Sequence, residues 1–318
     1  TLLQVRDLSV TFGTGANTVE AVKRVSFDIG RGETLALVGE SGSGKSLTAL
    51  SVLQLLPTGG TNPTGSIVLD GKQMIGAGPD DLHRARGDIA GTIFQEPMTS
   101  LNPLHRIGRQ IAEAILLHRS LSAREVEKQV MTVLAQAGFP DAADRLEAFP
   151  HQLSGGQRQR AMITMALAND PALLIADEPT TALDVTIQSQ ILQLLRDLKQ
   201  RRGLALLLIT HDLGLVRRHA DRVAVMYAGQ IVEEAPVAAM FARPAHPYTR
   251  ALLSATPVAD PHHKKERIVL QGEMPSPFHP PSGCAFHPRC PLAMPECSQR
   301  APALEEKQSR LVACWATK

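Results

Sequence analysis

The chain has 318 residues, of which 43% are hydrophobic and 20% are charged, a balance typical of a folded protein that divides into two or three units. Its 33 Lys and Arg residues nearly cancel its 31 Asp and Glu residues, which argues against nucleic acid or an anionic membrane as the main partner. No apolar run approaches the ~18 residues of a membrane-spanning helix, and the first ten residues show no secretion signal, so we expect a cytosolic chain.

Residues 1–95 are predicted to form short strands and turns around one strand–loop–helix segment at 33–56. Within that segment lies the G-x4-G-K-[ST] pattern of a phosphate-binding loop. Its glycines allow backbone N–H groups to point at phosphate oxygens, and the helix that follows adds its positive end. Lys45 is expected to reach the β- and γ-phosphates of a nucleotide, and the Ser46 hydroxyl to bind Mg²⁺. The predicted nucleotide contacts of this loop are Gly39, Ser41, Gly42, Gly44, Lys45 and Ser46.

Residues 96–157 change in character and are predicted to be mainly helical. The segments 106–120 and 122–138 repeat their apolar side chains at a spacing near 3.6 residues. A further helix is predicted after LSGGQ at 153–157, where a serine and two glycines at a helix start form a second anion-binding site. The chain contains one phosphate-binding loop, so it has no second nucleotide whose phosphate could occupy this second site. Ser154, Gly155, Gly156 and Gln157 are therefore expected to act on a nucleotide that another chain binds.

The segment ALLIADEPTTALD, residues 172–184, is predicted to be a buried strand that ends in two carboxylates. An apolar strand that runs into Asp177 has the form of a Walker B element, whose aspartate holds the metal ion. Glu178, next to it, is placed to polarise an attacking water. Residues 186–203 are predicted to form a helix with Ile187, Ile191, Leu194, Leu195 and Leu198 on one face, ending at Gly203.

Beyond residue 236 the chain has one short helical stretch and then becomes rich in proline, so we expect that it does not pair into an ordinary core. All four cysteines lie in this tail, as Cys284-x5-Cys290-x6-Cys297-x16-Cys314. Disulfides seldom persist in a reducing compartment, and four unrelated buried thiols would be clustered by accident. A site with four thiolate ligands would supply the folding energy that the tail lacks. The closely spaced C-x2–4-C pairs typical of structural zinc sites are absent from this tail. The wider spacing of its cysteines suits an iron–sulfur cluster, with zinc as the alternative.

Taken in chain order, these motifs resemble the ATP-binding subunits of ABC transporters over residues 1–235. LSGGQ is the signature of that family, and its Q-loop glutamine matches Gln95 in TIFQEPMTSLNP. Its D-loop matches 182–184 and ends at Asp184, its switch histidine matches His211, and its adenine-stacking aromatic residue matches Phe12. The resemblance implies an α/β fold, the ABC-type P-loop NTPase. Such a fold has a RecA-like core, an antiparallel β-subdomain and a helical subdomain at about 96–157.

The resemblance also implies a mechanism in which two ATPase subunits pair head to tail. Each ATP would lie between the phosphate-binding loop of one chain and the signature of the other. Gln95 would sense the γ-phosphate and contact Mg²⁺ together with Ser46 and Asp177. His211 would hold the γ-phosphate and the attacking water, and Glu178 would act as general base.

The tail resembles the C-terminal extension of the peptide-importer branch, in GCAFHPRCP and VACW, so residues 236–318 are interpreted as a small Cys-rich extension. In some members of that branch the four cysteines hold a [4Fe–4S] cluster. The implied partners are a second, related but different ATPase chain, two membrane-spanning permease subunits and, indirectly, an extracytoplasmic solute-binding protein. The implied location is the cytoplasmic face of a bacterial inner membrane. A nickel or other small-solute importer, and a soluble ABC ATPase without a membrane partner, are the alternatives.

Overall fold

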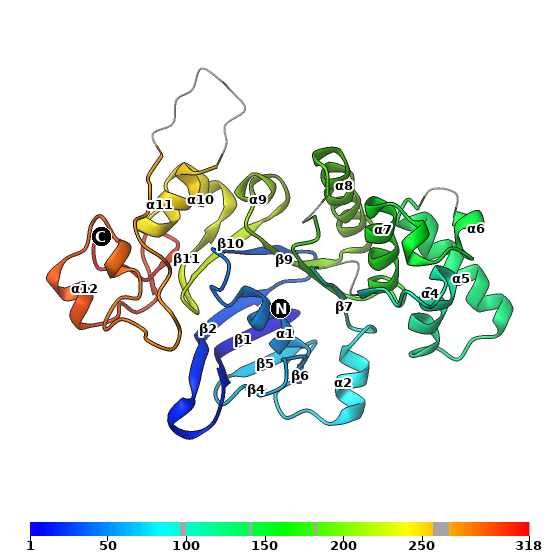
Figure 1. Cartoon of the computed structure of the whole chain (residues 1–318), viewed down its shortest axis with the longest axis horizontal. Coiled ribbons are helices and arrows are strands. Elements are labelled where there is room, and N and C mark those ends of the chain that lie inside the picture. The colour runs from blue at the N-terminus through cyan, green and yellow to red at the C-terminus, as the bar shows by residue number, and fades with distance from the viewer. Residues whose placement is uncertain (96–99, 140–141, 181–182, 257–266, 318) are drawn as a thin grey trace, which may run out of the picture. The chain divides into compact units, whose positions relative to one another are not determined.

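A computed structural model describes residues 1–95, 100–139, 142–180, 183–256 and 267–317. The chain divides into two compact units, each built from several segments of the sequence. Figure 1 labels most of the helices and strands along the chain. Unit 1 comprises residues 1–2, 29–33 and 69–208, and unit 2 comprises residues 3–28, 34–68 and 209–318.

Unit 2 contains most of the strands. In one sheet β2, β1 and β5 lie in that order and β4 pairs with β1. In the other, β10 pairs in parallel with β3 and antiparallel with β11, β11 pairs with β13, and β13 pairs with β12. The bounds of these strands are β1 (Leu3–Phe12), β2 (Val19–Ile29), β3 (Thr34–Val38), β4 (Gly60–Thr61), β5 (Ser66–Leu69), β10 (Arg222–Tyr227), β11 (Gln230–Pro236), β12 (Glu305–Glu306) and β13 (Leu311–Val312). The helices of this unit are η1 (Gly15–Asn17), α1 (Lys45–Val52), α9 (Leu213–His219), α10 (Val237–Ala242), α11 (Pro247–Ser254), η3 (His287–Arg289) and α12 (Pro295–Gln299).

Unit 1 is mainly helical and contains a few strands, of which β7 pairs in parallel with β8. Its strands are β6 (Lys72–Gln73), β7 (Ala90–Ile93), β8 (Leu173–Asp177) and the greater part of β9 (Ala205–Thr210). Its helices are α2 (Pro79–Ala85), α4 (Ile107–Leu116), α5 (Ala123–Gln136), α6 (Ala142–Arg145), η2 (Pro150–Gln152), α7 (Gly155–Ala166) and α8 (Val185–Arg202). The helices predicted at 106–120, 122–138 and after the LSGGQ segment are therefore confirmed.

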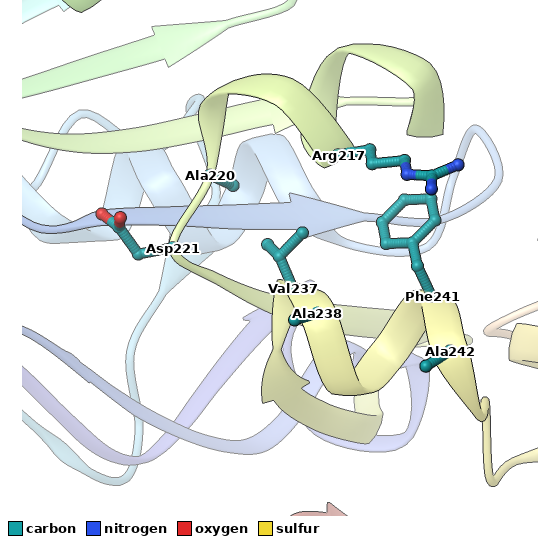
Figure 2. A pocket seen from close by; sticks show the side chains of 7 residues that line it. All are labelled: Arg217, Ala220, Asp221, Val237, Ala238, Phe241 and Ala242. Carbon is teal, nitrogen blue, oxygen red and sulfur yellow. The ribbon is translucent and has the colours of Figure 1, made fainter.

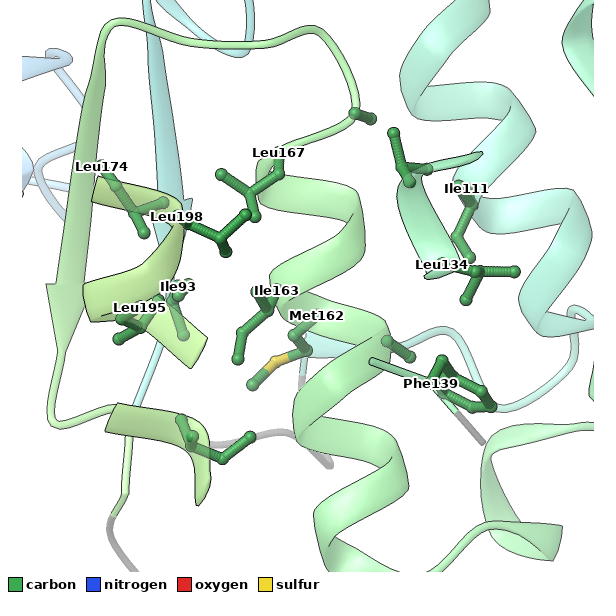
Figure 3. Packing of buried hydrophobic residues seen from close by; sticks show 14 of the residues in the cluster. Ile93, Ile111, Leu134, Phe139, Met162, Ile163, Leu167, Leu174, Leu195 and Leu198 are labelled. Carbon is green, nitrogen blue, oxygen red and sulfur yellow. The ribbon is translucent and has the colours of Figure 1, made fainter. Parts of the chain in front are cut away.

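The core of unit 1 forms where apolar side chains of α4, α5, α7 and α8 point toward one another (Figure 3). Helix α8 follows its predicted pattern: Ile191, Leu195 and Leu198 are buried, and the helix ends at Gly203 in a left-handed conformation with φ +63°. Glycine suits that position because it adopts positive φ without a steric penalty. The 3.6-residue spacing is sufficient to locate this helix because all the apolar residues of its buried face belong to one continuous segment.

The proline-rich tail does share an ordinary core, contrary to the expectation from its composition. Phe286 is fully buried, with its ring centroid 5.1 Å from that of Tyr227 and 5.5 Å from that of Tyr248. Val312 of β13 is also buried and pairs with Glu233 of β11. Proline excludes regular helices and strands, but a single aromatic side chain and a two-residue strand are enough to attach the tail to a core formed elsewhere. The predicted division at 235/236 stays a prediction.

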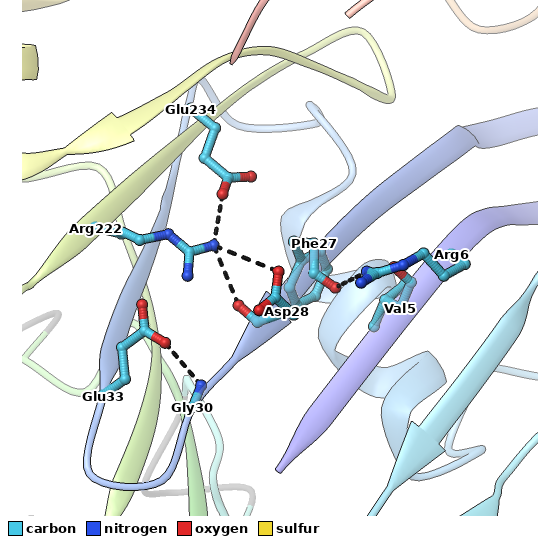
Figure 4. A network of polar contacts seen from close by, with 8 residues as sticks. All are labelled: Val5, Arg6, Phe27, Asp28, Gly30, Glu33, Arg222 and Glu234. Carbon is cyan, nitrogen blue, oxygen red and sulfur yellow. Dashed lines mark hydrogen bonds and ion pairs between the residues drawn. The ribbon is translucent and has the colours of Figure 1, made fainter. Parts of the chain in front are cut away.

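A polar network surrounds the first residue of β10 in unit 2. Arg222 donates to Glu234 Oε1 at 2.5 Å and to the backbone oxygen of Asp28 at 3.3 Å (Figure 4). The side chain of Glu234 is only 8% exposed, so its charge needs the arginine beside it. Arg222 therefore links the end of β2 to β10 and β11.

His246, just before α11, is a buried base whose protonation opposes folding. Its Nδ1 accepts the backbone N–H of Tyr248 at 3.1 Å, and its own backbone N–H donates to the Glu233 carboxylate at 2.8 Å. Burial lowers the pKa of His246 to about 3, and the charge of Arg250 acts in the same direction. In the unfolded chain the pKa returns to about 6.5, so the unfolded state binds the proton first.

We therefore expect that the free energy of unfolding falls as pH drops below about 6.5, because protonation pulls the chain toward the unfolded state. The contribution of this histidine amounts to at most about 1.4 kcal/mol per pH unit. Urea unfolding at pH 7.5, 6.5 and 5.5 measures it. His246→Asn, which keeps an acceptor for Tyr248, should have a shallower slope than wild type. Equal slopes for wild type and His246→Asn would contradict the expectation.

Candidate functional site

The phosphate-binding loop lies between β3 and α1 and has the backbone that the motif requires. Gly39 has φ +155°, and a Cβ built there would lie 2.3 Å from the backbone oxygen of Met226. Gly44, at the start of α1, has φ +101°. Any side chain at Gly39 would displace the loop from β10, so glycine is needed for close packing as well as for the curl. Ser41 and Gly42 are exposed at the tip of the loop.

Lys45 is folded back over this loop. Its ammonium donates to the backbone oxygens of Gly39 and Glu40, both at 2.9 Å, and to Ser43 Oγ at 3.4 Å. Although Lys45 is only 6% exposed, its charge is satisfied by loop carbonyls. Phosphate oxygens are stronger partners for an ammonium than neutral carbonyls are, so the side chain is held where an anion can take over these contacts.

Two of the predicted catalytic residues meet in unit 1. Asp177 is the last residue of β8, and Glu178 follows it with φ +47°, a left-handed conformation that is uncommon for a residue with a side chain. Gln95 Nε2 donates to Glu178 Oε2 at 3.3 Å. Backbone strain of this kind clusters at functional sites, where the surroundings hold a side chain in a required direction.

The LSGGQ segment begins α7 with a capping box. Ser154 Oγ accepts the backbone N–H of Gln157 at 3.3 Å, and Gln157 Oε1 accepts the backbone N–H of Ser154 at 2.9 Å. The S-x-x-Q spacing of residues 154–157 indicates such a capping box, which the prediction of this helix did not include. A Cβ built at Gly156 would lie 3.0 Å from a methyl of Ile187 in α8, so this glycine permits close helix packing, while Ser154 and Gly155 are exposed.

The remaining predicted residues lie at ends of elements. Asp184 caps α8 by accepting the backbone N–H of Ile187 at 2.9 Å. His211 is exposed directly after β9, and Asp212 caps the helix that follows. Phe12 ends β1 opposite Gly60 of β4. Residue 182 of the predicted D-loop lies outside the described residues.

The predicted nucleotide residues thus fall into one group in each unit. Unit 2 holds the phosphate-binding loop, Phe12 and His211. Unit 1 holds Gln95, Asp177, Glu178, Ser154 to Gln157 and Asp184. Within these groups, the structure joins Gln95 to Glu178 and Lys45 to its own loop.

Comparisons with known proteins identify the family. The family model described as "ABC transporter" matches residues 22–181, and the one described as "Oligopeptide/dipeptide transporter, C-terminal region" matches residues 232–297. The chain is 48% identical to the oligopeptide transport ATP-binding protein of Bacillus subtilis over 99% of this chain and 96% of that protein. It belongs to the ATP-binding subunits of ABC transporters.

Other similarities agree with this assignment. The chain is 55% identical over 275 residues to the peptidoglycan transport ATP-binding protein of Agrobacterium fabrum, of which it spans half the length. A dimeric ATP-binding cassette solved with ADP and Pi superposes with a TM-score of 0.67 at 29% identity, over 74% of this chain and 98% of that one. The α/β P-loop NTPase fold and ATPase activity that the motifs implied are therefore confirmed. Among the residues that the structure describes, no helix is long and apolar enough to cross a membrane.

The four cysteines of this ABC ATPase lie in one region of the extension, and none is in a disulfide. The Cys284 N–H donates to the backbone oxygen of Cys297 at 2.7 Å. Burial raises the pKa of the Cys284 thiol, and the charges of Cys297 and Cys314 raise it further. Burial also raises the pKa of Cys290, with the other three cysteines adding to it. The donor set suits a metal or cluster, although no three of the described His, Cys, Asp and Glu side chains are arranged to hold a metal ion.

A hollow of about 640 Å³ in this ABC ATPase is lined by residues of α9, α10 and the turn before β10. Figure 2 shows the Arg217 guanidinium beside the Phe241 ring, 5.7 Å from its centroid, with Asp221 at the other end. None of the predicted nucleotide residues lines this hollow, so it is separate from the candidate ATP site.

Proposed function

We propose that this ABC ATPase energises the import of di- and oligopeptides through ATP-driven dimerisation of two ATPase subunits. One observation carries the proposal: the ATPase model and the oligopeptide/dipeptide C-terminal model both match this single chain, in that order. Relatives matched over nearly their whole length are named as oligopeptide and dipeptide transport ATP-binding proteins of Bacillus subtilis.

In this proposal MgATP binds to the loop at 39–46, with Lys45 on the β- and γ-phosphates and Phe12 against adenine. Ser46, Gln95 and Asp177 hold Mg²⁺. Glu178 takes the proton of the attacking water, which His211 orients. The signature residues 154–157 and Asp184 complete the site of the partner ATPase subunit, and its signature completes this one. Closure of the pair on ATP then drives the transporter.

The proposed assembly contains this chain, a related but different ATPase chain and two membrane-spanning permease subunits. A peripheral position at the cytoplasmic face of the inner membrane follows from contact with the permeases. An extracytoplasmic solute-binding protein would deliver the peptide to the other side. Nucleic acid is not a partner, since the charges of the chain nearly cancel.

Uptake of a labelled tripeptide into proteoliposomes that contain the assembled complex tests this function. We expect accumulation that requires ATP on the side of this chain and that is lost when Glu178→Gln replaces the wild type. Nickel, and a peptide fragment of peptidoglycan, are tested in the same vesicles. ATP-dependent uptake of nickel with none of either peptide would overturn the peptide assignment and favour a small-solute importer.

We further propose that Cys284, Cys290, Cys297 and Cys314 hold a [4Fe–4S] cluster, with Zn²⁺ as the alternative. The support is a set of four thiols in one region together with the resemblance of this tail to extensions that bind such clusters. A bound cation would oppose the burial that raises the pKa of Cys284 and Cys290, and would stabilise the thiolates that bind it. The cluster would fold the tail, and no step of ATP hydrolysis passes through it.

Iron, sulfide and zinc contents of protein purified without air decide between the two. About four iron and four sulfide per chain are expected for the cluster. One zinc without iron would assign the tail to zinc, and an absence of all three would remove the metal proposal.

A further inference from the structure

Several residues of the Cys-rich extension contact the phosphate-binding loop, and they belong to unit 2 like the loop itself. Arg289, in η3 between Cys284 and Cys290, donates from Nη1 to both carboxylate oxygens of Glu40, at 3.2 and 3.1 Å. Met274 reaches the same loop, because its terminal methyl lies 3.3 Å from a Cβ built at Gly42. Arg289 and Glu40 are 249 positions apart in the sequence.

The contact between Arg289 and Glu40 is largely shielded from water. The arginine side chain is 7% exposed and the glutamate side chain 32%. Nη1 of the arginine also approaches the Tyr227 hydroxyl at 3.4 Å, and its guanidinium lies 5.8 Å from the Tyr227 ring centroid. A shielded ion pair responds much more strongly to the loss of one partner than an exposed pair does, because the remaining charge is left without compensation.

The backbone of Glu40 is held as firmly as its side chain. Its N–H donates to the Tyr248 hydroxyl at 3.0 Å, and its carbonyl oxygen accepts from Lys45 Nζ at 2.9 Å. Tyr248, Tyr227 and Phe286 pack together, with the two tyrosine ring centroids 4.7 Å apart. The second residue of the loop is therefore fixed from three directions, two of which come from the chain beyond residue 245.

A carboxylate at this position is unfavourable for a loop that binds phosphate. Glu40 follows Gly39 directly, in the stretch whose backbone is to face the nucleotide. The phosphates of ATP are strongly anionic, and an uncompensated negative charge within several ångströms weakens their binding. Arg289 both neutralises the Glu40 charge and directs it into the extension.

We propose that Arg289 is a positioning residue for the ATP site: by holding the Glu40 carboxylate, it makes the affinity for ATP depend on the Cys-rich extension. The inference rests on the proposed function, since it takes the loop at 39–46 as the nucleotide site. Arg289 touches neither the nucleotide nor the reacting atoms and acts through Glu40.

The test measures the Kd of the full-length chain for MgATP by calorimetry. Arg289→Met, which keeps the stem and removes the charge, should weaken binding about tenfold. In a Glu40→Gln background the same change should cost no more than about twofold, because no free carboxylate remains. A merely structural role of the arginine would not be relieved by Glu40→Gln. Arg300→Met, in an exposed arginine of the same extension, is the matched control and should bind as wild type.

Wild-type affinity in Arg289→Met, or a loss that Glu40→Gln does not recover, overturns the inference. If Arg289→Met does not fold, Arg289→Gln, which keeps a donor for Tyr227, takes its place with the same criteria. Lys45→Ala distinguishes a failure of the loop as the nucleotide site from a failure of the role of Arg289. Undiminished binding in Lys45→Ala would remove the loop as the nucleotide site, whereas loss in Lys45→Ala with none in Arg289→Met would remove only the role of Arg289.

Discussion

Glu178→Gln is expected to bind ATP and to pair with its partner subunit while hydrolysing ATP at least about 100-fold more slowly. The glutamine amide has the size of the carboxylate but cannot take the proton of the attacking water. The backbone at residue 178, with φ +47°, and the contact to the Gln95 amide would both be retained. The variant therefore removes the base and leaves the geometry.

Phosphate release by the assembled complex measures the rate, and size-exclusion chromatography with ATP measures pairing. Glu127→Gln, an exposed glutamate on α5 of the same unit, is the control and should hydrolyse ATP as wild type does. Wild-type turnover in Glu178→Gln would remove Glu178 from the mechanism. Loss of pairing as well as turnover would mean that the carboxylate has a structural role.

Lys45→Ala should weaken ATP binding on the order of 100-fold, the effect of removing a buried charge from its partner anion. The ammonium is 6% exposed and lies over the loop, where it bonds two backbone carbonyls. Without it the phosphates lose a charge-assisted contact, and the loop loses the group that holds Gly39 and Glu40 in place.

Calorimetric titration with MgATP gives the Kd. Urea unfolding of the same variant gives its free energy of unfolding, which should stay at the wild-type value if the substitution affects only the loop. Lys45→Met, which fills more of the space left by the side chain, should lose as much affinity as Lys45→Ala, because the charge is what matters. Lys128→Met on α5 is the control for a general loss of positive charge. Affinity within about threefold of wild type in both Lys45 variants would contradict the assigned role.

Elements whose signal is local could be predicted from the sequence. The phosphate-binding loop needs glycines at fixed positions, and Gly39 and Gly44 indeed have conformations that other residues rarely adopt. Helix α8 has its buried face and its terminal Gly203 where the spacing placed them. In each of these cases the residues that decide the structure lie within a few turns of one another.

Contacts between distant segments could not be predicted in this way. Phe286 in the proline-rich tail gives no periodic signal, yet it is buried among aromatic rings from β10 and α11. Arg289 and Glu40 are an ordinary arginine and an ordinary glutamate until the fold brings them together. Composition indicated that the tail needed stabilisation. Part of that stabilisation comes from an aromatic core and a two-residue strand, and both depend on tertiary contacts that the local sequence does not encode.

The composite ATP site is tested most directly by phosphate release from the assembled complex carrying Ser154→Arg. Ser154 belongs to the signature and is far in sequence from the phosphate-binding loop, so this chain should still bind ATP with wild-type affinity. An arginine there should block the contact with the partner's nucleotide and lower hydrolysis on the order of 100-fold. Ser122→Arg removes a comparable capping box from α5 and controls for the cost in helix stability. Wild-type hydrolysis by the Ser154→Arg complex would contradict a site shared between two subunits.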